Sequence, residues 1–105
     1  MTVAEESVLL DSIEHRTRPL RPEILTLAQS MTYKLDLNEH KRAWQHYGRG
    51  EAYWFLTKLR EEVEELQQAM LRGSAMDVML EAADVCNFAL FIHDLAHREG
   101  PIGDP

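Results

Sequence analysis

Apolar residues recur at steps of three and four along most of this chain, which is the spacing of amphipathic helices. Residues 3–16 show the pattern weakly, and the two prolines of "RTRPLRP" (16–22) interrupt it. A stronger helix is predicted from Glu23 onward, with Pro22 suited to its first turn. The apolar positions of that helix are Ile24, Leu27, Ala28, Met31 and Leu35.

Two further helices are predicted in the second half of the chain, over about residues 51–72 and 75–98. Gly73 suits the C-terminal cap of the first, and Ser74 or Asp77 suits the start of the second. No segment shows the alternation of a strand. The predicted fold class is therefore all-α, an antiparallel helical bundle of the four-helix type with short loops.

The segment "DLNEHKRAWQHY" (36–47) leaves one helix boundary open. The helix from Glu23 either runs through it or stops, because Asp36 or Asn38 is able to cap a second segment. The glycines of "GRG" (48–50) end whichever helix precedes them.

The length of 105 residues predicts one domain over residues 1–105, with 1–21 a weakly ordered or peripheral segment and 99–105 a frayed tail. A monomer of this size buries only about two-thirds of its unfolded surface, yet 45% of the residues are hydrophobic. Part of the apolar surface is thus available for an oligomer interface, and we expect a homodimer or a dimer of dimers. Met70, Met76 and Met79 are interpreted as core or as a dimer seam.

The formal net charge is −7, from 18 acidic and 11 basic side chains. This balance argues against binding to nucleic acid or to an anionic membrane surface, because both require a basic patch. No secretory signal is visible, and the longest apolar stretch, Phe88 to Ile92, is too short to span a bilayer. Cys86 is the only cysteine, which indicates a reducing, cytoplasmic location.

The segment "KLREEVEEL" (58–66) places four glutamates within five positions of a predicted helix. At about 100° per residue, Glu62 lies at the edge of the apolar stripe of that helix, Glu65 slightly further round and Glu61 beyond it. Glu64 points away and is expected to be solvated. Lys58 projects between Glu62 and Glu65.

The last helix carries Glu81 and Asp84, which are neighbours on one face because they are three residues apart. That helix is apolar nearly all round, so both carboxylates are expected in a buried setting, where an unpaired charge costs several kcal/mol. Lys58 is the best placed basic partner. If the two helices pack antiparallel, Glu62, Glu65, Glu81 and Asp84 converge, and divalent cations would balance their charge. Mg²⁺ is the expected ion and Mn²⁺ a substitute.

The paired motif Glu61-Glu62-x-x-Glu65 and Glu81-x-x-Asp84 resembles the EExxE…ExxD signature of the MazG-like all-α nucleoside triphosphate pyrophosphohydrolases. "KLREEVEEL" and "EAADVCNFALFIHDLA" (81–96) are similar to the two metal-binding helices of that family, and the resemblance covers roughly residues 23–97. It implies metal-dependent hydrolysis of (deoxy)nucleoside triphosphates to the monophosphate and pyrophosphate, in dimers or higher oligomers with pockets at subunit boundaries.

In this interpretation Glu62, Glu65, Glu81 and Asp84 hold the metal, and Glu61 or Glu62 orients or deprotonates the attacking water. No GxxxxGK[ST] sequence occurs, so the phosphates are not held by a P-loop.

Candidate substrate contacts have structural alternatives that the sequence leaves open. Lys58 contacts phosphate or pairs with Glu62. Asn87 holds a water, a metal or a nucleotide group, or makes an interhelical hydrogen bond. His40, Lys41 and Trp44 offer stacking and polar contacts to a base or sugar, although a packing role is favoured for Trp44.

Three alternative functions are considered beside this one. A phosphoribosyl-ATP pyrophosphohydrolase or a dimeric dUTPase has a related architecture and related acidic motifs. A di-iron bundle would require Glu-x-x-His pairs, and none occurs here. A non-catalytic helical interaction module would retain the motif without activity.

Overall fold

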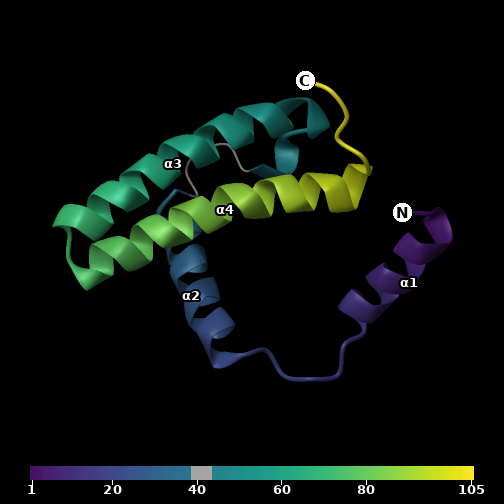
Figure 1. Ribbon diagram of the computed structural model, residues 1–105, viewed down its shortest axis with the longest axis horizontal. Helices are drawn as coiled ribbons and strands as arrows, with labels where there is room; N and C mark the ends of the chain where they lie inside the picture. The colour runs from purple at the N-terminus through teal and green to yellow at the C-terminus, as the bar shows by residue number, and fades with distance from the viewer. Residues whose placement is uncertain (39–43) are drawn as a thin grey trace.

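The computed structural model describes residues 1–38 and 44–105, and every regular element in those ranges is helical (Figure 1). The all-α prediction is confirmed. The predicted substrate contacts His40 and Lys41 lie outside the described residues. The elements are α1 (Val3–Glu14), α2 (Pro22–Leu37), the short 3₁₀ turns η1 (Trp44–His46) and η2 (Arg49–Glu51), α3 (Ala52–Arg72) and α4 (Ala75–Glu99).

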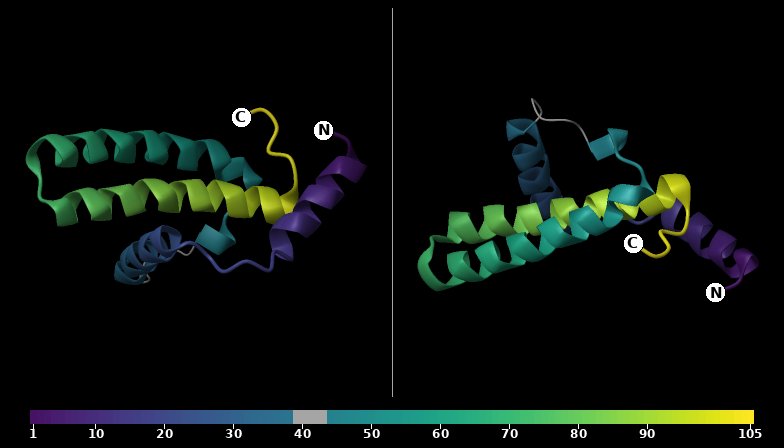
Figure 2. Two further views of the ribbon diagram at one scale, coloured as in Figure 1. Left: turned by 60° about the horizontal axis from the view of Figure 1, so that its bottom comes forward. Right: turned by 90° about the horizontal axis from the view of Figure 1, so that it is seen from above.

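The long helices α3 and α4 form an antiparallel pair that is closed by a tight turn at Gly73 and Ser74 (Figure 2). The Ser74 hydroxyl accepts a hydrogen bond from the Asp77 amide, and the Asp77 carboxylate accepts one from the Ser74 amide. This capping box starts α4 where the sequence predicts it. The predicted bounds of both helices are confirmed to within one residue.

The core lies at the other end of this pair, where α3 begins and α4 ends. Ala52, Phe55 and Leu95 are buried there. The partly buried side chains that pack against them are mostly aromatic: Trp44, Tyr47, Phe88, Phe91, Ile92 and Ile102. Aromatic contacts of Trp44 and Tyr47 therefore pack the turn η1 and the residue after it against the helix pair.

The C-terminal segment, for which a frayed tail over 99–105 is predicted, makes contacts with earlier parts of the chain. Glu99 completes α4. The Arg49 guanidinium donates to the Pro101 carbonyl at 3.2 Å, and the Tyr53 hydroxyl donates to the Gly103 carbonyl at 2.7 Å. Ile102 packs against the core. The contacts come from residues about fifty positions earlier, which no local pattern reveals.

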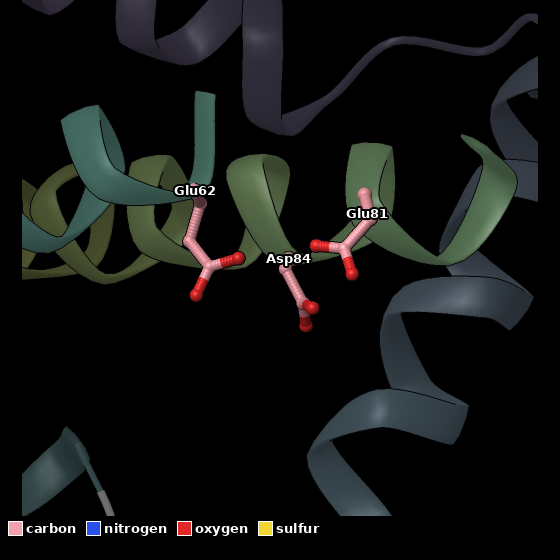
Figure 3. Close-up of side chains that lie close together, drawn as sticks. All are labelled: Glu62, Glu81 and Asp84. Atoms are coloured by element: carbon pink, nitrogen blue, oxygen red, sulfur yellow. The ribbon is translucent and has the colours of Figure 1, made fainter. Parts of the chain in front are cut away.

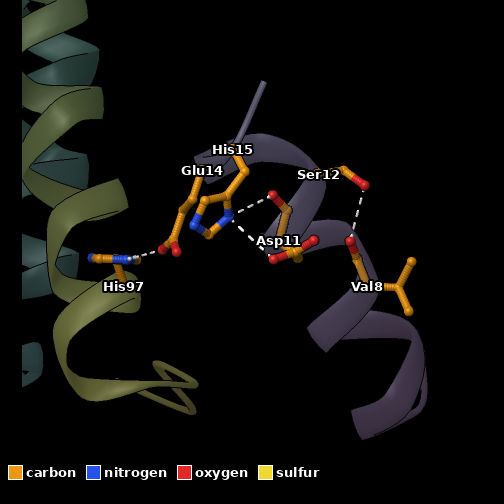
Figure 4. A network of polar contacts seen from close by, with 6 residues as sticks. All are labelled: Val8, Asp11, Ser12, Glu14, His15 and His97. Carbon is orange, nitrogen blue, oxygen red and sulfur yellow. Dashed lines mark hydrogen bonds and ion pairs between the residues drawn. The ribbon is translucent and has the colours of Figure 1, made fainter. Parts of the chain in front are cut away.

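The first two helices contact the pair less closely. Helix α2 crosses α4, and none of its residues is buried. Helix α1 also buries no residue; its Glu14 carboxylate contacts the His97 ring nitrogen on α4 at 3.2 Å (Figure 4). Within one chain the described helices thus form a pair with a crossing helix, and a four-helix bundle stays a prediction for an assembly.

The resulting shape is open. The radius of gyration is 15.7 Å, where about 13 Å is typical for this length. The accessible surface is 8096 Å², roughly 2,000 Å² more than a compact monomer of this mass exposes. Met70 and Met76 are more than half exposed, so they do not belong to the core of a single chain, and that alternative interpretation is wrong. None of the described helices is long and apolar enough to cross a membrane.

Candidate metal centre

The antiparallel packing of α3 and α4 brings three carboxylates together (Figure 3). Glu62 extends from α3, and Glu81 and Asp84 extend from successive turns of α4. Each offers one oxygen, and the three oxygens lie within 4.8 Å of one another. The i,i+3 spacing on α4 and the turn at Gly73 are sufficient to produce this convergence.

The environment opposes full ionisation of this group. Burial, followed by a hydrogen bond with Glu65 and the charges of Asp84, Glu65 and Glu81, raises the pKa of Glu62 to about 7. Burial and the neighbouring charges also raise the pKa of Glu81. One oxygen of Glu62 and one of Glu81 are buried without any hydrogen-bond partner. Such oxygens are costly unless another group satisfies them.

A hard divalent cation fits this arrangement. Mg²⁺ binds carboxylate oxygens at about 2.1 Å, so ligands on opposite sides of the ion lie about 4.2 Å apart. Ligands in adjacent positions around the ion lie about 3.0 Å apart, so the three oxygens, which lie within 4.8 Å of one another, would draw closer by rotation of their side chains. A bound cation would give a partner to the carboxylates of Glu62 and Glu81, each of which has a buried oxygen without one, and water would complete the coordination shell.

Lys34 is the basic residue at this group, and sequence reasoning missed it. Its ammonium nitrogen lies 3.1 Å from an Asp84 oxygen, and both side chains are about four-fifths buried. A signal was present, because Lys34 follows Met31 by three residues on the apolar stripe of α2. Its pairing with Asp84 could be inferred from that position only if the crossing of α2 and α4 beside Asp84 were known.

Lys58 was expected to be the best placed basic partner of the acids and either to contact phosphate or to pair with Glu62. The pair with Glu62 does not form, and the phosphate contact stays a prediction. Lys58 instead contacts the Glu61 carboxylate at 3.2 Å, one turn along the same helix. Its ammonium also lies 5.7 Å from the Trp54 ring centroid. Glu61 is 58% exposed and stands outside the three-carboxylate group.

Glu65, a predicted metal ligand, is exposed and lies beside the three-carboxylate group without belonging to it. It is close enough to raise the pKa of both Glu62 and Glu81. Glu65 and Glu81 also border an open groove of about 580 Å³ that runs toward the α3–α4 turn. The groove is lined by Glu64, Glu65, Gln68, Ala69, Arg72, Gly73, Asp77 and Glu81. Glu64 is exposed, as predicted.

Two other candidate residues make structural contacts. The Asn87 amide donates to the Met31 carbonyl at 3.1 Å, which is the interhelical alternative, although its side-chain oxygen is buried without a partner. The Trp44 ring stacks on Phe91 at 5.0 Å, and its indole nitrogen donates to Asp94 at 3.2 Å. The favoured packing role of Trp44 is confirmed.

Comparison of the chain with models of protein families, with curated proteins and with solved structures finds no match in any of the three.

Proposed function

We propose that this protein hydrolyses (deoxy)nucleoside triphosphates to the monophosphate and pyrophosphate with a divalent cation, Mg²⁺ or Mn²⁺. The observation that carries the proposal is the group of three carboxylate oxygens within 4.8 Å, two of whose side chains have a buried oxygen without a partner. The resemblance of the acidic motif to that of the MazG-like enzymes gives the reaction class.

Glu62, Glu81 and Asp84 would hold the cation, and Glu65 is near enough to contact it directly or through water. When bound, the cation would supply positive charge to phosphate oxygens and lower the pKa of a coordinated water. The net reaction adds water across the bond between the α- and β-phosphates and releases pyrophosphate.

A carboxylate that orients the attacking water or accepts its proton needs to lie at the site. The position of Glu62 among the three carboxylates supports that role, because a general base has to lie within hydrogen-bond reach of the proton that it accepts. Glu61 is the weaker candidate, because its carboxylate is occupied by Lys58 at 3.2 Å.

A second copy of the chain belongs to the proposal. The roughly 2,000 Å² of surface in excess of a compact monomer is of the size that stable dimers bury. The groove beside Glu65 and Glu81 is open along the helix pair. A partner chain packed against the pair would cover apolar surface and narrow this opening toward a nucleotide-binding pocket.

The test is a panel of NTPs and dNTPs incubated with Mg²⁺, with release of pyrophosphate as the readout. We expect Glu81→Gln and Glu65→Gln to lower turnover by about 100-fold or more, while Glu6→Gln on the exposed surface of α1 leaves it unchanged. Absence of pyrophosphate release from every triphosphate, or equal turnover by Glu81→Gln, would contradict the proposal.

The same panel separates the related activities. Turnover confined to dUTP would identify a dUTPase-like enzyme, and turnover of phosphoribosyl-ATP alone would identify the corresponding pyrophosphohydrolase. A melting temperature that does not respond to Mg²⁺, together with no turnover, would indicate a non-catalytic module.

A further inference from the structure

Lys34 lies beside the three-carboxylate group and contacts one of its members, Asp84. It extends from α2, whereas the acids extend from α3 and α4. Its contact with Asp84 is one of two polar contacts that join α2 to this part of α4; the other runs from Asn87 to the Met31 carbonyl, one turn away. The ammonium group is thus brought to the site by a third helix.

Negative charges outnumber positive charges at this site. Glu62, Glu65, Glu81 and Asp84 amount to as many as four negative charges, and within the described ranges Lys34 is the basic side chain that lies within ion-pair distance of any of them. Lys58 is paired with Glu61 outside the group. Lys34 therefore compensates part of the negative charge of the group.

We propose that Lys34 is an exchangeable counter-ion of the metal site: its ammonium group pairs with Asp84 in the metal-free protein, leaves that carboxylate when a divalent cation binds, and then contacts the phosphates of the substrate. This inference rests on the proposed function. It assigns to Lys34 a substrate-binding role that the acidic motif does not contain.

The physical basis is competition for one carboxylate. A cation coordinated by the Asp84 oxygen that Lys34 contacts at 3.1 Å would lie within about 5 Å of the ammonium nitrogen. Two positive charges at that distance repel each other strongly, so the ammonium group would move. The lysine stem is flexible, and its head is a compact cation with three donors, which suits phosphate oxygens.

The test compares wild-type protein with Lys34→Gln, Lys34→Met and Lys34→Arg. Mn²⁺ affinity is measured by calorimetry, and the affinity for a non-hydrolysable dNTP analogue is then measured at saturating Mn²⁺. Lys34→Met retains the aliphatic stem, so one neutral variant is available if the other does not fold. Arg60→Gln on the exposed side of α3 is the control for net charge.

We expect both neutral variants to bind Mn²⁺ roughly three- to tenfold more tightly, because no ammonium group has to be displaced. The same variants should bind the analogue at least about threefold more weakly. Lys34→Arg and Arg60→Gln should resemble the wild type in Mn²⁺ affinity.

Unchanged or weaker Mn²⁺ binding by the neutral variants would overturn the exchange, and unchanged analogue binding would overturn the contact with phosphate. If the wild-type protein itself does not bind Mn²⁺, the proposed function fails, and that result is distinct from a failure of Lys34 alone.

Discussion

At the scale of single residues, the protonation of Glu62 is the most informative property of the site. Its pKa of about 7 in the folded protein exceeds the value of about 4.3 for an unfolded glutamate. Between these two values the folded state binds more protons than the unfolded state. The free energy of unfolding therefore falls as the pH rises through this window.

We accordingly predict that the metal-free protein, kept in a chelator, melts at a lower temperature as the pH is raised from about 5 to about 8. Glu62→Gln removes the titrating group and should reduce this decline. Circular dichroism melts of both proteins at several pH values provide the measurement. A melting temperature that stays constant or rises over this range in the wild type would refute the prediction.

The residues of the site differ in how far the sequence could predict them. Glu62, Glu81 and Asp84 were predictable, because helical spacing and an antiparallel turn fix their relative positions. Lys34 was not, because its contact with Asp84 depends on how α2 crosses α4, and two unconnected helices have no register in the sequence. The pairing of Lys58 with Glu61 and not with Glu62 has a smaller cause, because both carboxylates are within its reach on one helix.

At the scale of elements, the turn between α3 and α4 sets the relative positions of Glu62 on α3 and of Glu81 and Asp84 on α4. Gly73 has an extended backbone, which any residue adopts, so its requirement for glycine is steric. A Cβ atom there would lie 2.9 Å from both the Ala69 carbonyl oxygen and the Asp77 Cβ. One of these neighbours is backbone, and the close approach is therefore difficult to relieve.

We predict that Gly73→Ala lowers the free energy of unfolding by about 1–3 kcal/mol and weakens divalent-cation binding, since the two helices carrying the ligands would shift. Gly50→Ala is the matched control, because a Cβ atom there meets nothing within 4 Å. Urea denaturation of both variants decides the point. Equal stability of Gly73→Ala and wild type would show that the turn tolerates the added methyl group.

The elements were predictable where their signals are local. The C-terminal end of α3 follows from Gly73, and the start of α4 follows from Ser74 and Asp77. The prolines mark the gap before α2. The anchoring of the C-terminal segment by Arg49 and Tyr53 was not predictable, since both contacts join residues about fifty positions apart.

At the scale of the whole molecule, the chain exposes roughly 2,000 Å² more surface than a compact monomer of its mass. The exposed fractions of Met70, Met76 and Met79 are 68%, 58% and 41%, and these side chains flank the α3–α4 turn. Large exposed apolar patches mark association sites, and we expect these three side chains to contribute to one. A second copy of the chain is the partner that the proposed function requires.

We predict a molar mass by light scattering of at least twice the 12.2 kDa of one chain. A Met76→Glu/Met79→Glu double variant should shift the mass toward the monomer, because charges would be buried at the interface. A monomeric wild type would remove the dimer from the account, and a double variant of unchanged mass would place the interface elsewhere.

The central claim is that acids from α3 and α4 form one site for a divalent cation. The most direct measurement is the anomalous difference density of a crystal soaked in Mn²⁺ at about pH 8, where the Glu62 carboxyl is mostly ionised. The account predicts a peak in direct contact with Glu62, Glu81 and Asp84, with the Lys34 ammonium withdrawn from Asp84. A map without a peak there, or with the three carboxylates turned apart into solvent, would contradict it.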